Sequence, residues 1–193
     1  LPTHAYMKYL YKYPQQAFPY AELRAENARR GRHDPEYELL DTGIFDANRY
    51  FDVFIEYAKA GPNDVLVRIS AANRGPDAAT LHLLPTLWFR NDWSWKPDRP
   101  RPRIAPAPQR ANVLETTHRR LETFWLHFDP PQDVLFTDND SNAARLWGRP
   151  SAGFAKDGFD DCIVHGREDA VNAAQFGTKA APHYRFVVAS GET

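Results

Sequence analysis

The stretch FRNDWSW, residues 89–95, combines two kinds of side chain that together could recognise a sugar. Indole rings offer flat surfaces for the apolar C–H faces of a sugar ring, and guanidinium, amide and carboxylate groups offer hydrogen bonds for its hydroxyl groups. The same composition is typical of a domain interface or of a core edge, so the residues alone leave these alternatives open. The candidate substrate-binding or interface residues are Arg90, Asn91, Asp92, Trp93 and Trp95.

The histidines do not have the spacing of a metal site. A zinc site usually draws on pairs of ligands separated by a few residues, such as His-x-x-x-His. The 7 histidines are scattered through the chain without such a pair. We therefore expect no bound metal and no cofactor. The histidines are His4, His33, His82, His118, His127, His165 and His183.

The acidic and nucleophilic residues form no recognisable catalytic motif. The stretch DNDSN at 138–142 begins like a calcium loop, but Ala143 and Arg149 occupy the positions that need glycine and glutamate. Cys162 and His165 would point to opposite faces of a strand. The sequence contains neither a Gly-x-Ser-x-Gly elbow nor a glycine-rich phosphate loop. Glycoside hydrolysis needs two carboxyl groups roughly 5 to 10 Å apart, and sequence does not show that distance. We assign no catalytic residue.

Composition narrows the classes of partner. The net charge is −1, so no overall field attracts nucleic acid, and no apolar run is long enough to span a membrane. The single cysteine, Cys162, allows no internal disulfide, and the first residues lack a signal-peptide pattern. These features predict a cytoplasmic location. We interpret the tyrosines of KYLYKYPQQAFPY, residues 8–20, as a packing surface.

The dominant hydrophobic period is two, which is typical of β-strands. Apolar residues alternate with polar ones over 51–58 and 65–72, and the turn between them predicts a hairpin. We expect 80–89 to complete a three-stranded meander, with an edge, bulge or bend at Pro85 because proline cannot donate to a strand ladder. In that arrangement Val67 would be buried, and Val67→Asp would cost several kcal/mol by burying an unpaired charge.

Other short apolar runs, bounded by turn residues, predict further strands. They lie at 37–45, 112–117, 122–129, 133–138, 143–148, 161–166 and 184–189. Helices are expected at 18–31 and, shorter, at 167–177. The stretch 96–110 holds 5 prolines and is expected to be a long loop rather than the interior of a strand or helix. The pattern as a whole predicts an all-β antiparallel sandwich with one or two short helices.

Several blocks of the sequence resemble the amino-terminal part of bacterial proteins similar to glycoside hydrolase family 63, which includes processing α-glucosidase I and mannosylglycerate-hydrolase-like enzymes. The blocks are THAYMKYLYKYPQQAFPYAEL, EYELLDTGIFDANRYFDVFIEYAKA, NRGPDAATLHLLPTLWFRNDWSW and LFTDNDSNAARLWG. The resemblance implies that 1–193 is a single β-supersandwich domain, a fragment of a larger protein. It also implies that the fragment packs against a carboxy-terminal (α/α)6 toroid that carries both catalytic acids.

The resemblance therefore implies a function for the whole protein and a different one for this chain. The whole protein would be an inverting glycoside hydrolase acting on α-linked glucose- or mannose-type sugars. This chain would be its non-catalytic domain, with 89–95 facing the missing domain or its oligosaccharide and at least one of Trp93 and Trp95 exposed. The alternative is a stand-alone carbohydrate-binding or protein-interaction β-sandwich module.

Overall fold

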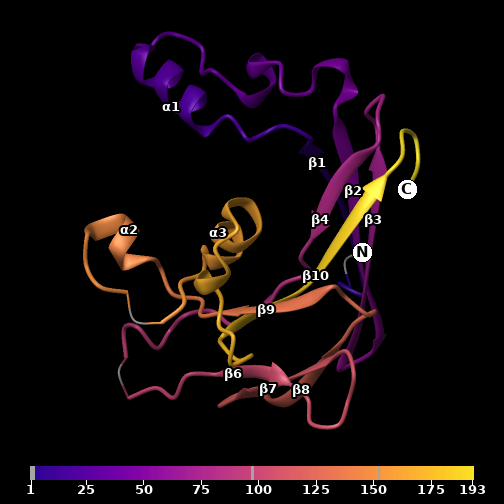
Figure 1. Ribbon diagram of the computed structural model, residues 1–193, viewed down its shortest axis with the longest axis vertical. Coiled ribbons are helices and arrows are strands. Elements are labelled where there is room, and N and C mark those ends of the chain that lie inside the picture. Colours follow the sequence, from indigo (N-terminus) through magenta and orange to yellow (C-terminus); the bar gives the residue numbers. More distant parts are fainter. Residues whose placement is uncertain (1–2, 97, 152) are drawn as a thin grey trace. The chain divides into compact units, whose positions relative to one another are not determined.

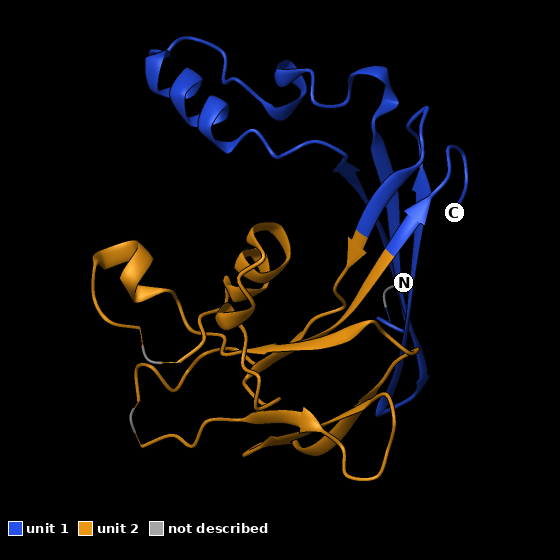
Figure 2. Ribbon diagram, viewed as in Figure 1, with its two compact units in different colours: residues 1–81, 186–193 blue, residues 82–185 orange. Residues whose placement is uncertain are grey.

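The computed structural model of the chain describes residues 3–96, 98–151 and 153–193. The fold is all-β, with three antiparallel sheets and a few short helices, which confirms the predicted fold class (Figure 1). Among the described residues no helix is both long enough and apolar enough to cross a membrane. The chain divides into two compact units (Figure 2): unit 1 comprises residues 1–81 and 186–193, and unit 2 comprises residues 82–185.

The sheet of unit 1 has the strand order β1-β2-β3, with β1 at Tyr6–Pro14, β2 at Tyr50–Gly61 and β3 at Asp64–Asn73. The β2–β3 hairpin confirms the pairing predicted for 51–58 and 65–72. The third strand of this sheet is β1 rather than the predicted 80–89, so the meander prediction was wrong. Strand pairing depends on tertiary contacts, and the sequence neighbour of a hairpin is not always its partner.

The two faces of this sheet differ in chemistry. Tyr9 lies opposite Ile55, and Ile55 lies opposite Ile69. The odd-numbered residues of the three strands therefore share one face of the sheet. The resulting aromatic face comprises Met7, Tyr9, Tyr11, Tyr13, Phe51, Val53, Ile55, Tyr57, Val65, Val67, Ile69 and Ala71. The opposite face carries ion pairs, in which Lys12 and Arg74 each lie 2.7 Å from Asp52 and Arg68 lies 2.9 Å from Glu56.

The aromatic face is buried only along its centre. Phe51 on β2 is 1% exposed, whereas Tyr9 on β1 is 56% exposed and Val67 on β3 is 48% exposed. The expected burial of Val67 was therefore wrong, because β3 is an edge strand and its first half carries its side chains into solvent. A charge at Val67 would remain hydrated.

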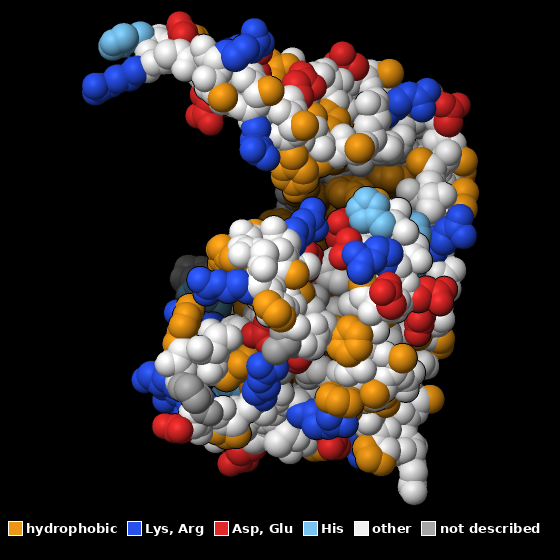
Figure 3. Space-filling model, turned by 60° about the vertical axis from the view of Figure 1, so that its left-hand side comes forward, with side chains coloured by type: hydrophobic (Ala, Val, Ile, Leu, Met, Phe, Trp, Pro, Cys, Tyr) orange, Lys and Arg blue, Asp and Glu red, His pale blue; other side chains and the backbone are white. Residues whose placement is uncertain are grey.

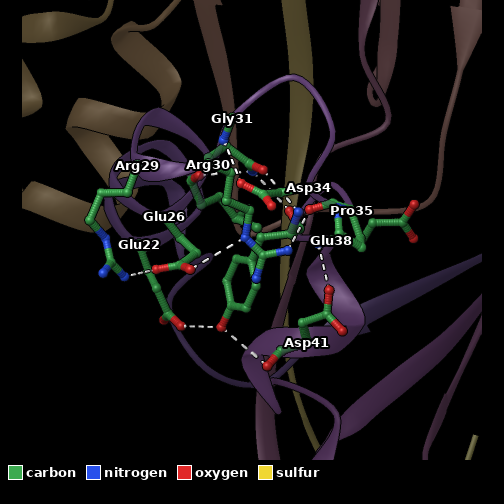
Figure 4. Close-up of polar contacts among 12 residues, drawn as sticks. Glu22, Glu26, Arg29, Arg30, Gly31, Asp34, Pro35, Glu38 and Asp41 are labelled. Atoms are coloured by element: carbon green, nitrogen blue, oxygen red, sulfur yellow. Dashed lines mark hydrogen bonds and ion pairs between the residues drawn. The ribbon is translucent and has the colours of Figure 1, made fainter.

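Between β1 and β2 the chain forms α1, Tyr20–Arg29, as predicted, and two 3-10 helices, η1 at Leu39–Thr42 and η2 at Asp46–Asn48. No residue of α1 is buried, so polar contacts hold the segment together (Figure 4). The amide group of Asn27 exchanges two hydrogen bonds with the backbone of Tyr37, at 2.8 and 2.9 Å. The phenol of Tyr37 donates to Glu22 at 2.6 Å.

The strand predicted at 37–45 was wrong, because η1 occupies its centre. A reciprocal capping box between Glu38 and Asp41 begins this helix, and Gly43, with a φ of 69°, ends it. The acidic and glycine residues that look like turn signals around a strand are here the two ends of a helical turn.

The second sheet has the order β4-β10-β5, with β9 also paired to β10. Its strands are β4 at Ala79–Leu83, β5 at Leu87–Trp88, β9 at Asp133–Thr137 and β10 at Lys179–Val188. The interruption between β4 and β5 falls on Pro85 and confirms the break predicted there. Strands were also correctly predicted at β9 and β10.

The third sheet has the order β6-β7-β8, with β6 at Arg103–Pro106, β7 at Val113–His118 and β8 at Glu122–His127. The last two strands were predicted, but β6 lies inside the proline-rich stretch that was expected to be a loop. A single apolar residue explains this strand: Ile104 is fully buried, and its backbone exchanges hydrogen bonds with Gly177 at 2.8 and 3.1 Å. A side chain at Gly177 would place its Cβ 2.2 Å from the carbonyl oxygen of Thr137.

The second and third sheets of the chain enclose the main hydrophobic core, whose buried residues all belong to unit 2. This cluster is contributed by both sheets and by the segment after β5, and its buried members are Phe89, Trp93, Ile104, Leu114, Phe136 and Ala180. Helix α3, Gly158–His165, contributes to a second cluster through Phe159, which groups with Leu135 and Ala181. Strands β9 and β10 are therefore covered on both faces, which explains the continuous apolar run of β9.

Three predictions for 143–177 were wrong. The expected strands at 143–148 and 161–166 are helices, α2 at Ala143–Trp147 and α3, and the expected helix at 167–177 is only the short 3-10 helix η3, Glu168–Ala170. Asn142 caps the start of α2, while Gly148 and Gly166 end α2 and α3 in the left-handed conformation. Apolar runs this short look alike in strands and helices, and the caps decide between them.

Candidate functional site

The structure separates the two indoles of the FRNDWSW stretch. Trp93 is 4% exposed and belongs to the core cluster of unit 2, beside Phe89. Trp95 is 77% exposed. The expectation that at least one of these indoles is exposed is confirmed by Trp95, whereas Trp93 contributes to packing. The segment is therefore anchored by one tryptophan and presents the other to solvent.

Asp140 is the polar centre of this region. Its Oδ1 accepts hydrogen bonds from the side chains of Asn91 at 2.5 Å, Trp93 at 3.1 Å and Ser94 at 3.1 Å. Its Oδ2 lies 3.2 Å from the guanidinium group of Arg101. The indole N–H of Trp93 thus has a partner at the edge of an apolar core, as a buried indole requires. Both oxygens of Asp140 are engaged, so this carboxylate serves to position its neighbours.

The DNDSN stretch ties the loop down from the other side. Asn91 donates to the carbonyl of Asn139 at 3.1 Å and accepts from the backbone of Ser94 at 3.1 Å, while Asn139 donates to the carbonyl of Phe89 at 2.8 Å. Asp138 accepts from the backbone of Thr178 at 3.1 Å. These side chains satisfy backbone and side-chain groups that would otherwise lack partners. Their resemblance to a calcium loop reflects this structural role.

Asp92 and Arg90 lie outside this network. Asp92 pairs with Arg99 and, at 3.0 Å, with Arg119. Desolvation would raise the pKa of Asp92, but the two arginines outweigh it and hold the pKa below its usual value. Arg90 is exposed. Neither residue lines the groove that opens beside Trp95.

A groove of about 540 Å³ opens beside Trp95. Its wall includes a second exposed indole, Trp147 at the end of α2, which is 62% exposed. Polar groups complete the lining, and the described residues around the groove are Asn91, Ser94, Trp95, Arg101, Asn139, Asp140, Ser141, Ala143, Trp147, Ser151 and Lys156. Two apolar rings with amide, hydroxyl and charged groups between them suit a ligand that has both apolar faces and hydroxyl groups. On the face shown in Figure 3, hydrophobic side chains are likewise interspersed with charged ones.

Sequence reasoning missed several groove residues. Trp147 and Arg101 were assigned to a strand and to a featureless proline-rich loop, and Asp140 to an isolated turn. The helix cap at Asn142 was the available signal for Trp147, since an Asn cap followed by Gly148 marks a short helix that would present Trp147 at its end. Nothing in the sequence indicates that Asp140 lies against Trp93.

One acidic cluster of the described residues lies on α3 and does not line this groove. The carboxylates of Asp160 and Asp161 lie near His165 on this helix, with ligand atoms within 4.8 Å of one another. Two of these three residues are exposed, and Asp161 pairs with Arg167 at 3.5 Å. Cys162 and His165, expected on opposite faces of a strand, are instead on this helix, and burial raises the pKa of the Cys162 thiol. These features make Cys162 a packing residue and give no nucleophile.

The chain is similar to a longer protein from yeast. It is 36% identical over 221 aligned positions to the uncharacterized protein YMR196W of Saccharomyces cerevisiae, and the match covers 96% of this chain and 20% of the yeast protein. The chain thus spans about one fifth of the length of this curated relative. No protein-family model and no solved structure matches the chain.

Proposed function

We propose that this chain is a non-catalytic β domain of a glycoside hydrolase, and that the groove beside Trp95 contacts the oligosaccharide at the mouth of a separate catalytic domain. The observation that carries the proposal is the pairing of two exposed indoles, Trp95 and Trp147, on one polar groove. The resemblance of the sequence to glycoside hydrolase family 63 supplies the enzyme class. The catalytic acids, an inverting mechanism and an (α/α)6 fold would belong to the rest of the protein.

The aromatic face of unit 1 supports the second half of the proposal, in which this domain packs against further polypeptide. Tyr9, Tyr11 and Val67 are each about half exposed, although their side chains are apolar over most of their surface. Exposed apolar patches of this kind mark interaction surfaces. The yeast relative contains about four times as much chain outside the matched region as within it, which is enough for a catalytic domain that covers this face.

The proposed substrates are α-linked glucose- or mannose-type oligosaccharides, which present apolar C–H faces and a rim of hydroxyl groups. Stacking on an indole uses the apolar face, and Asn91, Arg101 and Lys156 can bond the hydroxyl groups. The proposed location is the cytoplasm, because the chain has one cysteine and no internal disulfide.

Calorimetric titration of the purified chain with maltotriose and with an α-linked mannotriose tests the groove. We expect weak binding that Trp95→Ala and Trp147→Ala each reduce at least about tenfold, or about 1.4 kcal/mol. Trp125→Ala is the matched control, because Trp125 is 45% exposed on β8 and does not line the groove. Equal loss of binding in the control, or no binding to any α-linked oligosaccharide, would contradict the sugar-contacting role.

Activity measurements separate this domain from its enzyme. The 193-residue chain should hydrolyse none of the maltose-type, kojibiose-type or aryl α-glycoside substrates. In a longer protein that includes the catalytic domain, Trp95→Ala should raise the KM for an oligosaccharide and leave kcat nearly unchanged, since uniform binding energy is lost. Turnover by the 193-residue chain would refute the non-catalytic assignment.

A second candidate function is a stand-alone carbohydrate-binding or protein-interaction module. The aromatic face favours it, because any partner protein with an apolar surface could cover that face. The two candidates differ in their response to Tyr9→Thr. If a catalytic domain on the same polypeptide covers the aromatic face, Tyr9→Thr should make the longer protein less stable or less active. If the chain is a stand-alone module, Tyr9→Thr should weaken only its binding to a separate partner.

A further inference from the structure

His82 on β4 and His183 on β10 face each other across neighbouring strands, and the groove does not involve them. The Nδ1 atom of His82 lies 2.8 Å from the Nε2 atom of His183, and both side chains are partly buried. Their ring centroids are 5.1 Å apart with an interplanar angle of 15°. This separation of the ring centres is close to the N–N distance plus the distance from centre to nitrogen in each ring. It is reached only when the two centres and the two nitrogens lie nearly on one line. The rings therefore lie edge to edge in nearly one plane, with the two nitrogens pointing at each other.

This geometry holds a single proton between the rings. One nitrogen donates its N–H and the other must offer a lone pair, so the contact exists when both imidazoles are neutral or when only one is charged. When both rings are protonated, two N–H groups oppose each other at hydrogen-bonding distance. The contact is then repulsive. In-line lone pairs at this spacing also leave no room for a metal ion between them, because metal–nitrogen distances are about 2.0 Å.

The surroundings favour the neutral pair near neutral pH. Burial lowers the pKa of His82, and the charge of Arg185 adds to this effect. Burial likewise lowers the pKa of His183; the neighbouring His82 and Arg185 lower it further, and Asp133 opposes them. Asp133 lies opposite His183 in the β9–β10 register. The other ionisable groups on this side come from α3 and η3, namely Cys162 and Glu168, which line a cavity of about 500 Å³ together with both histidines.

The pair also has a particular place in the chain. The polypeptide passes between the two compact units twice, once between Leu81 and His82 and once between Arg185 and Phe186. His82 is thus the first residue of unit 2, and His183 lies two residues before its last residue, Arg185. The hydrogen bond joins β4 and β10 within unit 2.

We propose that the His82–His183 pair is a pH-responsive latch within unit 2 that holds β4 against β10 and opens when both imidazoles become protonated. On opening, the His82–His183 hydrogen bond is lost and one ring turns into the adjoining cavity, where the carboxylates of Asp133 and Glu168 stabilise its charge. The strands then part locally, while the core of unit 2, which contains neither histidine, stays intact.

Histidine-selective NMR of the 193-residue chain from about pH 8 to about pH 5 tests the latch, since histidines titrate in this range. The two rings should titrate in two coupled steps rather than as independent sites. At the second step, the protection factors of the β4 and β10 amides, which allow for the pH dependence of intrinsic exchange, should fall at least about tenfold, and those of β7 should not change. Independent titration, or unchanged protection of β4 and β10 at low pH, would overturn the proposal.

Two variants sharpen the test. His82→Gln and His183→Gln each replace an imidazole by a neutral amide that can still donate and accept. Each variant that folds should keep protected β4 and β10 amides down to pH 5, because only one charge can form. His127→Gln is the control for removing a histidine outside the pair, and it should open like the unsubstituted chain. If His82→Gln and His183→Gln open in acid as much as the unsubstituted chain does, the latch is refuted.

Discussion

Unit 2 closes its apolar residues between two sheets, whereas the sheet of unit 1 leaves half of its aromatic face in water. Ile104 and Phe136 of the unit 2 core are at most 1% exposed. Tyr9 and Tyr11, on the aromatic face of unit 1, are 56% and 48% exposed. The sheet of unit 1 arises from an alternation of apolar and polar residues. The alternation identifies an apolar face, but it does not say which element covers that face.

Because of this difference, the two regions contribute differently to the stability of the chain. Burial stabilises by roughly 25 cal/mol per Å² of apolar area, so the unit 2 core contributes to stability within this chain. The aromatic face retains apolar area that a covering partner could still bury.

Ile104→Asp should prevent unit 2 from folding, because it places an unpaired charge at a fully buried position between two sheets. The loss should exceed about 4 kcal/mol. Val67→Asp, on the aromatic face, should change the free energy of unfolding by less than about 1 kcal/mol because Val67 is 48% exposed. Urea denaturation followed by circular dichroism measures both. Comparable losses in the two variants would show that the aromatic face is as closed as the core.

Trp93→Ala should destabilise the chain by about 3 to 5 kcal/mol, since it leaves a cavity in the unit 2 core and removes a donor to Asp140. Trp95→Ala, two residues along the chain, should change stability by less than about 0.5 kcal/mol because the indole is exposed. Thermal unfolding of the two variants gives this difference directly. A stability loss at Trp95 as large as at Trp93 would mean that the groove is part of the core.

The charged face of unit 1 should dominate the stability of the chain in acid. Desolvation would raise the pKa of Asp52, but its hydrogen bonds and ion pairs with Lys12 and Arg74 outweigh it, so the pKa is lower in the folded state than in the unfolded state. The stabilisation is therefore present above the unfolded pKa of about 3.9 and is lost as pH falls through the folded pKa.

Asp52→Asn should remove this acid-sensitive contribution and cost about 1 kcal/mol at pH 7, the size expected for ion pairs whose basic partners are half exposed. Urea titrations at pH 7 and at pH 3 provide the measurement. The gap between the variant and the unsubstituted chain should narrow at pH 3. Asp77→Asn is the control, because Asp77 pairs with Arg49 while its own side chain is 68% exposed. An equal gap at both pH values would contradict the role given to Asp52.

The sequence correctly predicted the long alternating runs of the β2–β3 hairpin and several shorter elements. The β2–β3 hairpin, the strands β7 to β10 and helix α1 were expected close to where they occur. Short apolar runs were less informative, because the five residues of α2 fit a strand equally well until the cap at Asn142 is considered. The strand at Ile104 was missed because prolines surround its one buried apolar residue, although it pairs with the neighbouring strand β7.

The sequence predicted the candidate site only in part. FRNDWSW correctly indicated an exposed indole, Trp95, but the assignment of Trp93 to the same surface failed to account for the core behind it. Three other residues of the groove lie further along the chain than Trp95: Arg101 by 6 positions, Asp140 by 45 and Trp147 by 52. Such long-range juxtapositions arise from tertiary packing, and no local pattern encodes them.

A small effect on stability, and the most direct test of the aromatic face, is expected from Tyr9→Thr combined with Tyr11→Thr. Both positions lie on the edge strand β1, where threonine keeps the β-propensity. The free energy of unfolding should fall by less than about 1 kcal/mol, because about half of each side chain is exposed. Binding of the dye ANS, which reports exposed apolar surface, should fall clearly. Tyr20→Thr on α1 is the matched control, since Tyr20 is 70% exposed but lies outside the aromatic face, and it should leave dye binding nearly unchanged. If the double variant instead unfolds the sheet while dye binding rises, the tyrosines are holding unit 1 together, and the face is a core surface rather than a surface kept for a partner.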